Sequence, residues 1–133
     1  MRAYSLLLIG ILLVVIAILG AIYVFFTPPT HSTPEAQTLA ACLAGKGAVM
    51  YGAAWCPHCQ NEKHAFGVEA FALIPYVECP VERARCVSIG IHLFPTWIFG
   101  NPSTNSGQVA IRLEGEQGLA KLAAQSGCPY LTP

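Results

Sequence analysis

Apolar residues are concentrated in one N-terminal run and then recur in short segments separated by polar and turn residues. Residues 4–26 form the apolar run, and residues 3–34 contain no Asp, Glu, Lys or Arg. As a helix this run would be roughly 34 Å long, enough to cross a bilayer core of about 30 Å. We therefore expect residues 1–26 to form a single transmembrane helix that acts as a signal-anchor.

The charges beside the run set its expected orientation. Arg2 is the only charge at its head, so the positive-inside rule puts the N-terminus in the cytoplasm and residues 27–133 on the extracytoplasmic side. A cleaved signal peptide is the alternative, although its apolar core is usually shorter and is followed by a small-x-small site. The bulky residues 22–26 at the end of the run favour an uncleaved anchor.

Beyond the anchor, the pattern predicts a linker and one α/β domain. Residues 27–38 are rich in Pro and Thr and are typical of a semi-extended linker. Residues 39–133 are expected to form the domain, in which helical and strand-like segments alternate. Helices are predicted over 35–43, from 56 through 66 with a continuation to 73 beyond a kink at Gly67, over 81–88 and over 116–126, and strands over 48–52, 76–79, 96–99 and 109–113.

The most reactive candidate in the domain is a pair of closely spaced cysteines. Cys56 and Cys59 are separated by Pro57 and His58, directly after an apolar strand-like segment. At the first turn of a helix, a Cys56 thiolate would face unpaired backbone N–H groups and the positive end of the helix dipole. Pro57 suits the first helical position, and a protonated His58 would stabilise the thiolate further. The pattern predicts thiol–disulfide exchange.

Composition narrows the alternatives. Six cysteines in so short a chain suit an oxidising compartment. Seven basic residues balance seven acidic ones without a Lys/Arg cluster, which argues against nucleic-acid binding. Zinc sites usually pair ligands two to four residues apart, whereas six residues separate Cys79 from Cys86. We expect no metal and no other cofactor, although His64 or His92 could complete a site in a copper-handling protein.

Several segments together point to a known family. The segment Lys46–Gln60, with Phe66-Gly67 and Phe94–Trp97, closely resembles the thioredoxin-like domains associated with bacterial and archaeal vitamin K epoxide reductase homologues. The likeness extends from about Cys42 to Cys128. More distantly, the Cys-Pro-His-Cys loop is similar to that of the periplasmic disulfide oxidases. The resemblance implies an α/β, three-layer thioredoxin-like fold with a central mixed sheet.

The resemblance also implies roles for single residues. Cys56 would be the exposed sulfur that attacks or is attacked, and Cys59 the more buried resolving sulfur. Pro95 matches the cis-proline that faces the CxxC loop throughout the thioredoxin superfamily; an ordinary trans loop is the alternative. The implied catalytic set is Cys56, Cys59, His58, Pro57 and Pro95, and the implied substrate-binding set is Trp55, Phe94 and Thr96.

One position departs from the thioredoxin pattern. Met50 stands where thioredoxins carry a buried carboxylate, six residues before the first cysteine. Proton transfer would then fall to water, to His58 or to a group that the sequence does not identify. The Pro-His pair stabilises the reduced form of the couple, which favours a disulfide donor over a reductase.

The other four cysteines are expected to be paired. A Cys79–Cys86 disulfide would close a small loop and stabilise the fold by about 2–3 kcal/mol, and the related domains carry a cysteine pair in this region. A second redox relay is the alternative for that pair. Cys42 and Cys128 are expected to join the first helix of the domain to the last, with two buried, unpaired sulfurs as the alternative.

These observations predict a membrane-anchored, extracytoplasmic thiol–disulfide oxidoreductase that introduces disulfides into cysteine-containing exported proteins. A single span is too few to form a quinone site, so re-oxidation is expected from a separate quinone-linked membrane partner that resembles a vitamin K epoxide reductase. The shared bilayer would raise the local concentration of both proteins. The alternatives are a thiol reductase, a copper-handling thioredoxin-like protein and a non-catalytic interaction module.

Overall fold

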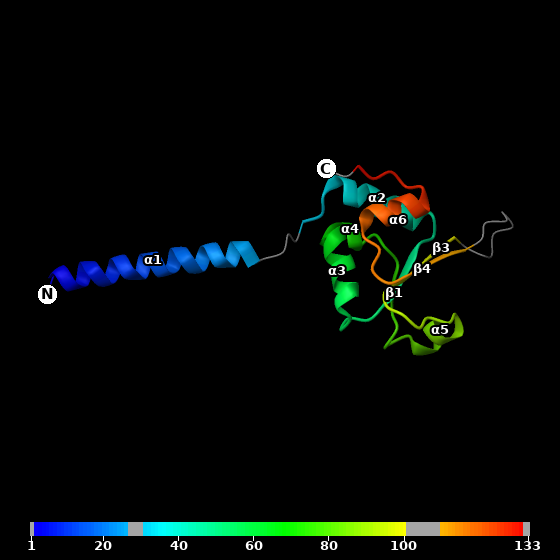
Figure 1. Ribbon diagram of the computed structural model, residues 1–133, viewed down its shortest axis with the longest axis horizontal. Coiled ribbons are helices and arrows are strands. Elements are labelled where there is room, and N and C mark those ends of the chain that lie inside the picture. Colours follow the sequence, from blue (N-terminus) through cyan, green and yellow to red (C-terminus); the bar gives the residue numbers. More distant parts are fainter. Residues whose placement is uncertain (1, 27–30, 101–109, 132–133) are drawn as a thin grey trace.

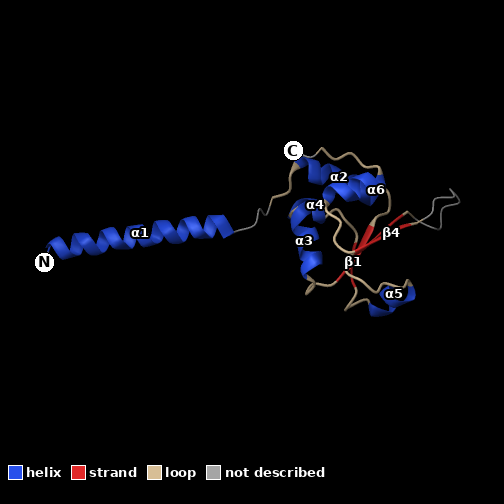
Figure 2. Ribbon diagram, in the orientation of Figure 1, coloured by secondary structure: helices blue, strands red, loops and turns tan. Residues whose placement is uncertain are grey.

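A computed structural model describes residues 2–26, 31–100 and 110–131 of the chain (Figure 1). Over these residues the chain forms six helices and four strands, coloured by type in Figure 2. In chain order they are α1 (Arg2–Phe26), α2 (Pro34–Gly45), β1 (Val49–Gly52), α3 (Pro57–Phe66), α4 (Val68–Phe71), β2 (Tyr76–Glu78), α5 (Arg83–Ser88), β3 (Thr96–Phe99), β4 (Ile111–Glu114) and α6 (Leu119–Ser126).

The four strands form one mixed sheet in the order β2-β1-β3-β4. β1 pairs with β2 in parallel, because α3 and α4 carry the chain back between them, and it pairs with β3 antiparallel. β3 and β4 are also antiparallel, with Phe99 opposite Ile111. The mixed sheet expected from the sequence is therefore confirmed.

Alternate residues of the central strand enter two different cores. Met50 packs with Trp97 and with the buried faces of α2, α3, α4 and α6, on one side of the sheet. Tyr51 points the other way and packs with Val77, with Cys79 after β2 and with Cys86 on α5. In Figure 1, α5 lies on the opposite side of the strands from α2 and α6. The result is three layers, with most helices on one face of the sheet and α5 on the other.

The N-terminal apolar segment forms α1, and its described side chains, those of residues 8–23, are exposed. Over the fully described part of the chain, which includes residues 8–23 of α1, no helix is long and apolar enough to cross a membrane.

The helix predicted over 35–43 begins earlier, inside the expected linker 27–38. Thr33 adopts an extended conformation and its hydroxyl accepts a hydrogen bond from the Ala36 N–H at 3.2 Å, while Pro34 occupies the first helical turn. This is an ordinary N-terminal cap. The linker is therefore helical from Pro34 onward, and its residues 27–30 lie outside the described part of the chain.

The residues just before α2 contact α4 rather than solvent alone. The Ser32 hydroxyl accepts a hydrogen bond from the Ala70 N–H at 2.7 Å, and the Ser32 N–H donates to the Glu69 carboxylate at 2.8 Å. The hydrogen bond from the Ser32 N–H, with smaller contributions from neighbouring donors, lowers the pKa of Glu69 to about 2. His31, expected to be a solvated linker residue, lies 3.1 Å from the same carboxylate although its side chain is exposed.

The predicted break at Gly67 is confirmed, because this residue has φ +77° and separates α3 from α4. The helix predicted over 81–88 begins only at Arg83. The strand predicted over 109–113 is displaced toward the C-terminus and runs from Ile111 to Glu114, while its expected first residue, Val109, lies outside the described residues.

The largest departure is at the start of the last helix. The pattern predicts a helix over 116–126, whereas α6 begins at Leu119. Gly115 and Gly118 have φ values of +83° and +72°, which a right-handed helix does not accommodate, and residues 116–118 are irregular. The expected end of this helix is confirmed, because Gly127 adopts the left-handed conformation at its C-terminus.

Both expected disulfide pairings are present. Cys42 on α2 is bonded to Cys128 after α6, with an S–S distance of 2.04 Å. Cys79 after β2 is bonded to Cys86 on α5, with an S–S distance of 2.05 Å. The six cysteines all lie in the described residues, and the two that stay unpaired are Cys56 and Cys59.

Candidate active site

The unpaired cysteines lie where β1 leads into α3. Cys56 is the N-cap of α3 with an extended backbone, and Pro57 occupies the first helical position, as the sequence predicts. The Cys56 N–H donates to the Ala53 carbonyl at 3.1 Å, which closes the turn between strand and helix. Cys56 therefore lies at the N-terminal end of α3, the end of a helix that favours negative charge.

A second loop covers this sulfur. The Phe94–Pro95 peptide bond is cis, and the Cys56 thiol donates to the Phe94 carbonyl at 3.7 Å. Cys56 is consequently only 5 % exposed, whereas the sequence led us to expect an exposed sulfur. Trp55 is 72 % exposed and its ring meets the Phe94 ring edge-on, with centroids 6.1 Å apart.

Thr96, expected in the substrate-binding set, is fully buried. Its hydroxyl donates to the Leu93 carbonyl at 2.7 Å. The Thr96 side chain therefore braces the loop that contains Pro95 and does not reach the surface where a substrate would bind.

Cys59 is the third residue of α3 and has no exposed surface. Burial raises the pKa of the Cys59 thiol to about 12, partly offset by a hydrogen bond from the Ala53 backbone. The sulfur lies against Gly52, the last residue of β1: a Cβ at that position would be 2.7 Å from Sγ. Cys59 is thus the more buried member of the pair, as expected.

Three polar side chains near Cys59 were not predicted as site residues. The Tyr76 hydroxyl donates to Glu78 Oε2 at 2.6 Å, and Glu78 Oε1 accepts a hydrogen bond from the Ala54 N–H at 2.9 Å. Lys63 Nζ lies 3.8 Å from the centroid of the Tyr76 ring. Burial, followed by the hydrogen bond to Glu78, raises the pKa of Tyr76. Tyr76 and Glu78 alternate along a strand, so the sequence pattern showed only an ordinary β segment.

His58 turns toward a carboxylate. Its Nδ1 lies 2.9 Å from Glu116 Oε2, and the same oxygen accepts a hydrogen bond from Asn61 at 3.2 Å. These contacts lower the pKa of Glu116, with the hydrogen bond from His58 as the largest cause. The imidazole is therefore held at the rim of the site by the loop before α6.

A buried carboxylate on α3 holds that same loop in place. Glu62 is 1 % exposed and accepts hydrogen bonds from the N–H groups of Gln117 and Gly118 at 2.7 and 2.9 Å. Burial raises the pKa of Glu62, partly offset by these two donors. The loop in turn contacts the cis-proline, because the Gly115 N–H donates to the Pro95 carbonyl at 2.7 Å. Glu62 thus links the CxxC helix to the loop that faces it.

The structure does not bring the alternative metal ligands together. Within residues 31–100 and 110–131, no group of three or more His, Cys, Asp or Glu side chains is placed to hold a metal ion. His64 and His92, which could have completed such a site, take no part in the hydrogen bonds around Cys56 and Cys59 described above.

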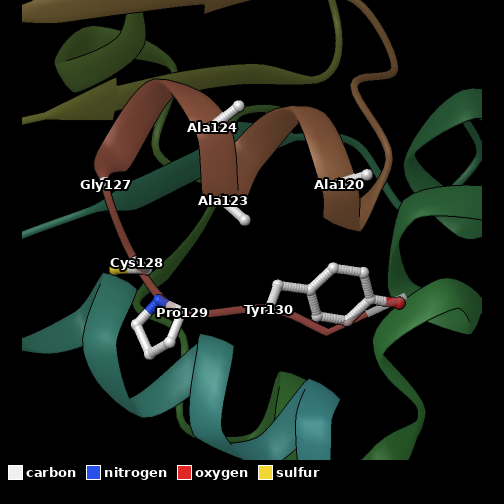
Figure 3. A pocket seen from close by; sticks show the side chains of 7 residues that line it. All are labelled: Ala120, Ala123, Ala124, Gly127, Cys128, Pro129 and Tyr130. Carbon is white, nitrogen blue, oxygen red and sulfur yellow. The ribbon is translucent and has the colours of Figure 1, made fainter. Parts of the chain in front are cut away.

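A shallow hollow of about 550 Å³ lies elsewhere, between α6 and the C-terminal segment (Figure 3). None of its residues belongs to the CxxC or cis-proline loops, so it is separate from the candidate site. They are Ala120, Ala123, Ala124, Gly127, Cys128, Pro129 and Tyr130.

Comparison with known proteins agrees with this geometry. No protein-family model matches the chain. The chain is 38% identical over 106 residues to Thiol-disulfide oxidoreductase LTO1 of Arabidopsis thaliana; the match covers 74% of this chain and 26% of that protein. The chain thus spans about a quarter of the length of this curated relative. Among solved structures, chloroplastic thioredoxin z superposes with a TM-score of 0.51 at 20% identity, over 67% of this chain and 84% of that one.

The fold of the domain and its sequence similarity to known proteins agree with each other. A CxxC pair at a helix N-terminus, opposite a cis-proline, stands on a sheet with helices on both faces. The domain has a thioredoxin-like fold, and it carries a free CxxC pair opposite its cis-proline.

Proposed function

We propose that this protein is a thiol–disulfide oxidoreductase that introduces disulfides into exported proteins through the Cys56–Cys59 couple. The observation that carries the proposal is the environment of Cys56. Its sulfur is free while four other cysteines are paired. It stands at the N-terminus of α3, within 3.7 Å of the carbonyl that precedes the cis-proline.

The proposed reaction begins from the oxidised couple. A substrate thiolate attacks Cys56 Sγ, the Cys56–Cys59 bond breaks, and its electron pair leaves on Cys59, which takes up a proton. A second substrate thiolate then attacks the first substrate sulfur and displaces Cys56 as a thiolate. The substrate gains one disulfide, and Cys56 and Cys59 are left reduced.

The contrast between the two sulfurs supports this direction. Because burial raises the pKa of Cys59 to about 12, Cys59 is held as a thiol once released. Uptake of this proton favours opening of the Cys56–Cys59 bond by a substrate thiolate. Because the thiolate, not the thiol, is the nucleophile, Cys59 attacks again only as it loses the proton.

We further propose that α1 anchors the domain to a membrane, with the domain on the extracytoplasmic side. The apolar sequence of residues 4–26 and the single charge of Arg2 before it support this arrangement. Re-oxidation would come from a quinone-linked membrane partner resembling a vitamin K epoxide reductase, which takes both electrons and protons from the reduced couple. Deleting that partner should leave Cys56 and Cys59 reduced in cells, and unchanged oxidation would contradict it.

Trapping tests the chemistry directly. A reduced Cys59→Ser variant of the full chain, mixed with the disulfide form of a substrate, should accumulate mixed disulfides. Cys56 attacks the substrate disulfide and displaces one of its sulfurs as a thiolate, and no Cys59 thiol remains to release the other. A Cys56→Ser variant should accumulate none and should lose peptide-oxidation activity. Equal trapping by both variants, or none by either, would contradict the proposal.

The reduction potential decides between donor and reductase. A disulfide donor should lie nearer to about −120 mV, and a reductase nearer to about −270 mV. The matched control is a Cys79→Ala/Cys86→Ala variant, whose Cys56–Cys59 potential should equal that of the natural chain if that second pair is structural. A potential that moves with the second pair would indicate an electron relay between the two.

A further inference from the structure

Cys59 and the Tyr76 hydroxyl border the same small space, which exists because residue 52 is glycine. A Cβ on Gly52 would lie 2.7 Å from Cys59 Sγ and 3.4 Å from the Tyr76 hydroxyl oxygen. That hydroxyl donates to Glu78 Oε2 at 2.6 Å. A sulfur, a phenol and a carboxylate therefore follow one another across the end of β1.

The strand register places Glu78 near the position on β1 where thioredoxins carry a buried carboxylate and this chain has Met50. Met50, which offers no proton acceptor, lies opposite Tyr76 on the parallel neighbour β2, and Gly52 lies opposite Glu78. The carboxylate therefore sits two residues further along the adjacent strand. Glu78 is only half-buried, so it can exchange protons with solvent, whereas Cys59 cannot.

The chemistry of re-oxidation requires such a group. To form the Cys56–Cys59 bond, Cys59 must lose a proton that burial holds tightly. The other ionisable groups that act on Cys59 are Cys56 and Lys63 on α3. Cys56 is occupied as the mixed disulfide in this step, and the Lys63 ammonium has no lone pair to accept a proton. Tyr76 and Glu78 on β2 remain.

We propose that Glu78, acting through the Tyr76 hydroxyl, takes the Cys59 thiol proton when Cys59 attacks a mixed disulfide at Cys56. The proton of Cys59 moves to the Tyr76 oxygen, directly or across one water molecule, as the Tyr76 proton moves to Glu78. The Cys59 electron pair forms the bond to Cys56, and the other sulfur leaves with the electron pair of the broken bond. The inference rests on the proposed function, and the reverse sequence delivers a proton to Cys59 when a substrate opens the disulfide.

A two-phase reaction with 5,5′-dithiobis(2-nitrobenzoate) separates the two sulfurs. The reduced full chain, in mild detergent, should release one nitrothiobenzoate as Cys56 attacks the reagent, and a second as Cys59 displaces the bound half. Tyr76→Phe keeps the ring and removes only the hydroxyl. Glu78→Gln keeps an acceptor for the Ala54 N–H and removes the base. Tyr130→Phe and Glu35→Gln are matched controls outside the site.

The second phase should slow by about 100-fold or more at pH 7 in both variants, since general-base catalysis typically contributes about 10²- to 10⁴-fold. The first phase should keep its rate. The gap should close as the pH rises, because hydroxide then removes the Cys59 proton without help. The double variant should be no slower than either single variant, because the two groups act in series.

Three outcomes would overturn the inference. They are an unchanged second phase in both variants, a slowing that is the same at every pH, and an equal slowing in the two control variants. A slowing that is the same at every pH would mean that Glu78 only positions the β1–α3 loop through its hydrogen bond with Ala54. Absence of the first phase in the natural chain would instead contradict the proposed function, so the two failures are distinguishable.

Discussion

The Cys59 sulfur occupies the space beside Gly52 that a side chain would fill: it lies 2.7 Å from where a Cβ of residue 52 would be. Since real Cβ atoms do not tolerate such an approach, any other residue at 52 must push the sulfur or the strand aside. The absence of a side chain at Gly52 therefore leaves the space that Cys59 Sγ occupies.

Replacing Gly52 by alanine should destabilise the protein by about 1–3 kcal/mol, because the added methyl overpacks a fully buried region. It should also slow the resolving step by displacing Cys59. Urea unfolding and the two-phase thiol reaction measure the two effects. Gly45→Ala is the matched control: no atom lies within 4 Å of its Cβ position, so stability there should stay level or rise. Equal effects at both glycines would contradict the prediction.

Alkylation should distinguish the two cysteines of the reduced protein. Because the pKa of Cys59 is raised to about 12 and the side chain is fully buried, iodoacetamide at pH 7 should modify Cys56 alone. Mass spectrometry of the intact chain should show one adduct in the natural protein and none in Cys56→Ser. Two adducts formed at similar rates at pH 7 would show that Cys59 is neither protonated nor shielded.

The two disulfides should contribute unequally to stability. The Cys42–Cys128 bond joins residues 86 apart in sequence and the Cys79–Cys86 bond residues 7 apart. In the chain-entropy description, removing the first pair by alanine substitution should lower the free energy of unfolding by about 4.6 kcal/mol, and removing the second by about 2–3 kcal/mol. Urea unfolding of each double variant measures both. A larger loss for the short loop would reverse the expected order.

Glu62 should make stability fall as the pH rises. Burial raises the pKa of Glu62 above its ordinary value, so the folded state binds this proton more tightly than the unfolded state. The contribution is fully present below the ordinary pKa of about 4.3 and is lost as the pH rises through the raised value. The slope is at most about 1.4 kcal/mol per pH unit.

The comparison of the natural chain with Glu62→Gln isolates that contribution. The carboxylates of Glu69 and Glu116, whose pKa values are lowered, act in the opposite direction, but both proteins share them. The difference in unfolding free energy between the two should therefore vary as the pH rises from about 4.3 through the raised pKa of Glu62. A difference that does not change with pH would contradict the prediction.

Local signals predicted much of the architecture. The strand over 96–99 and the break at Gly67 needed only chain-local information, and the structure places both as expected. The start of α6 could not be found in this way. The N–H groups of Gln117 and Gly118 are held by Glu62, 55 and 56 residues earlier, and a contact at that separation leaves no local periodicity.

Part of the candidate site could likewise be predicted from the sequence, and part of it could not. Cys56, Pro57 and Cys59 carry a spacing that the sequence displays, and Pro95 stood out through the resemblance. Tyr76 and Glu78 carry no such mark, because their position beside Cys59 depends on how β2 is registered against β1. The group that replaces the carboxylate missing at Met50 therefore becomes visible only once the sheet is assembled.

The bond between Cys42 and Cys128 turns nearly the whole domain into a covalent ring. A protease that cuts any one peptide bond between these two residues opens the ring but does not release a fragment, since both pieces stay attached through sulfur. If the N-terminal helix tethers the protein, a nicked domain would also stay tethered. Shedding would require a second cut, a reductant, or cleavage before residue 42.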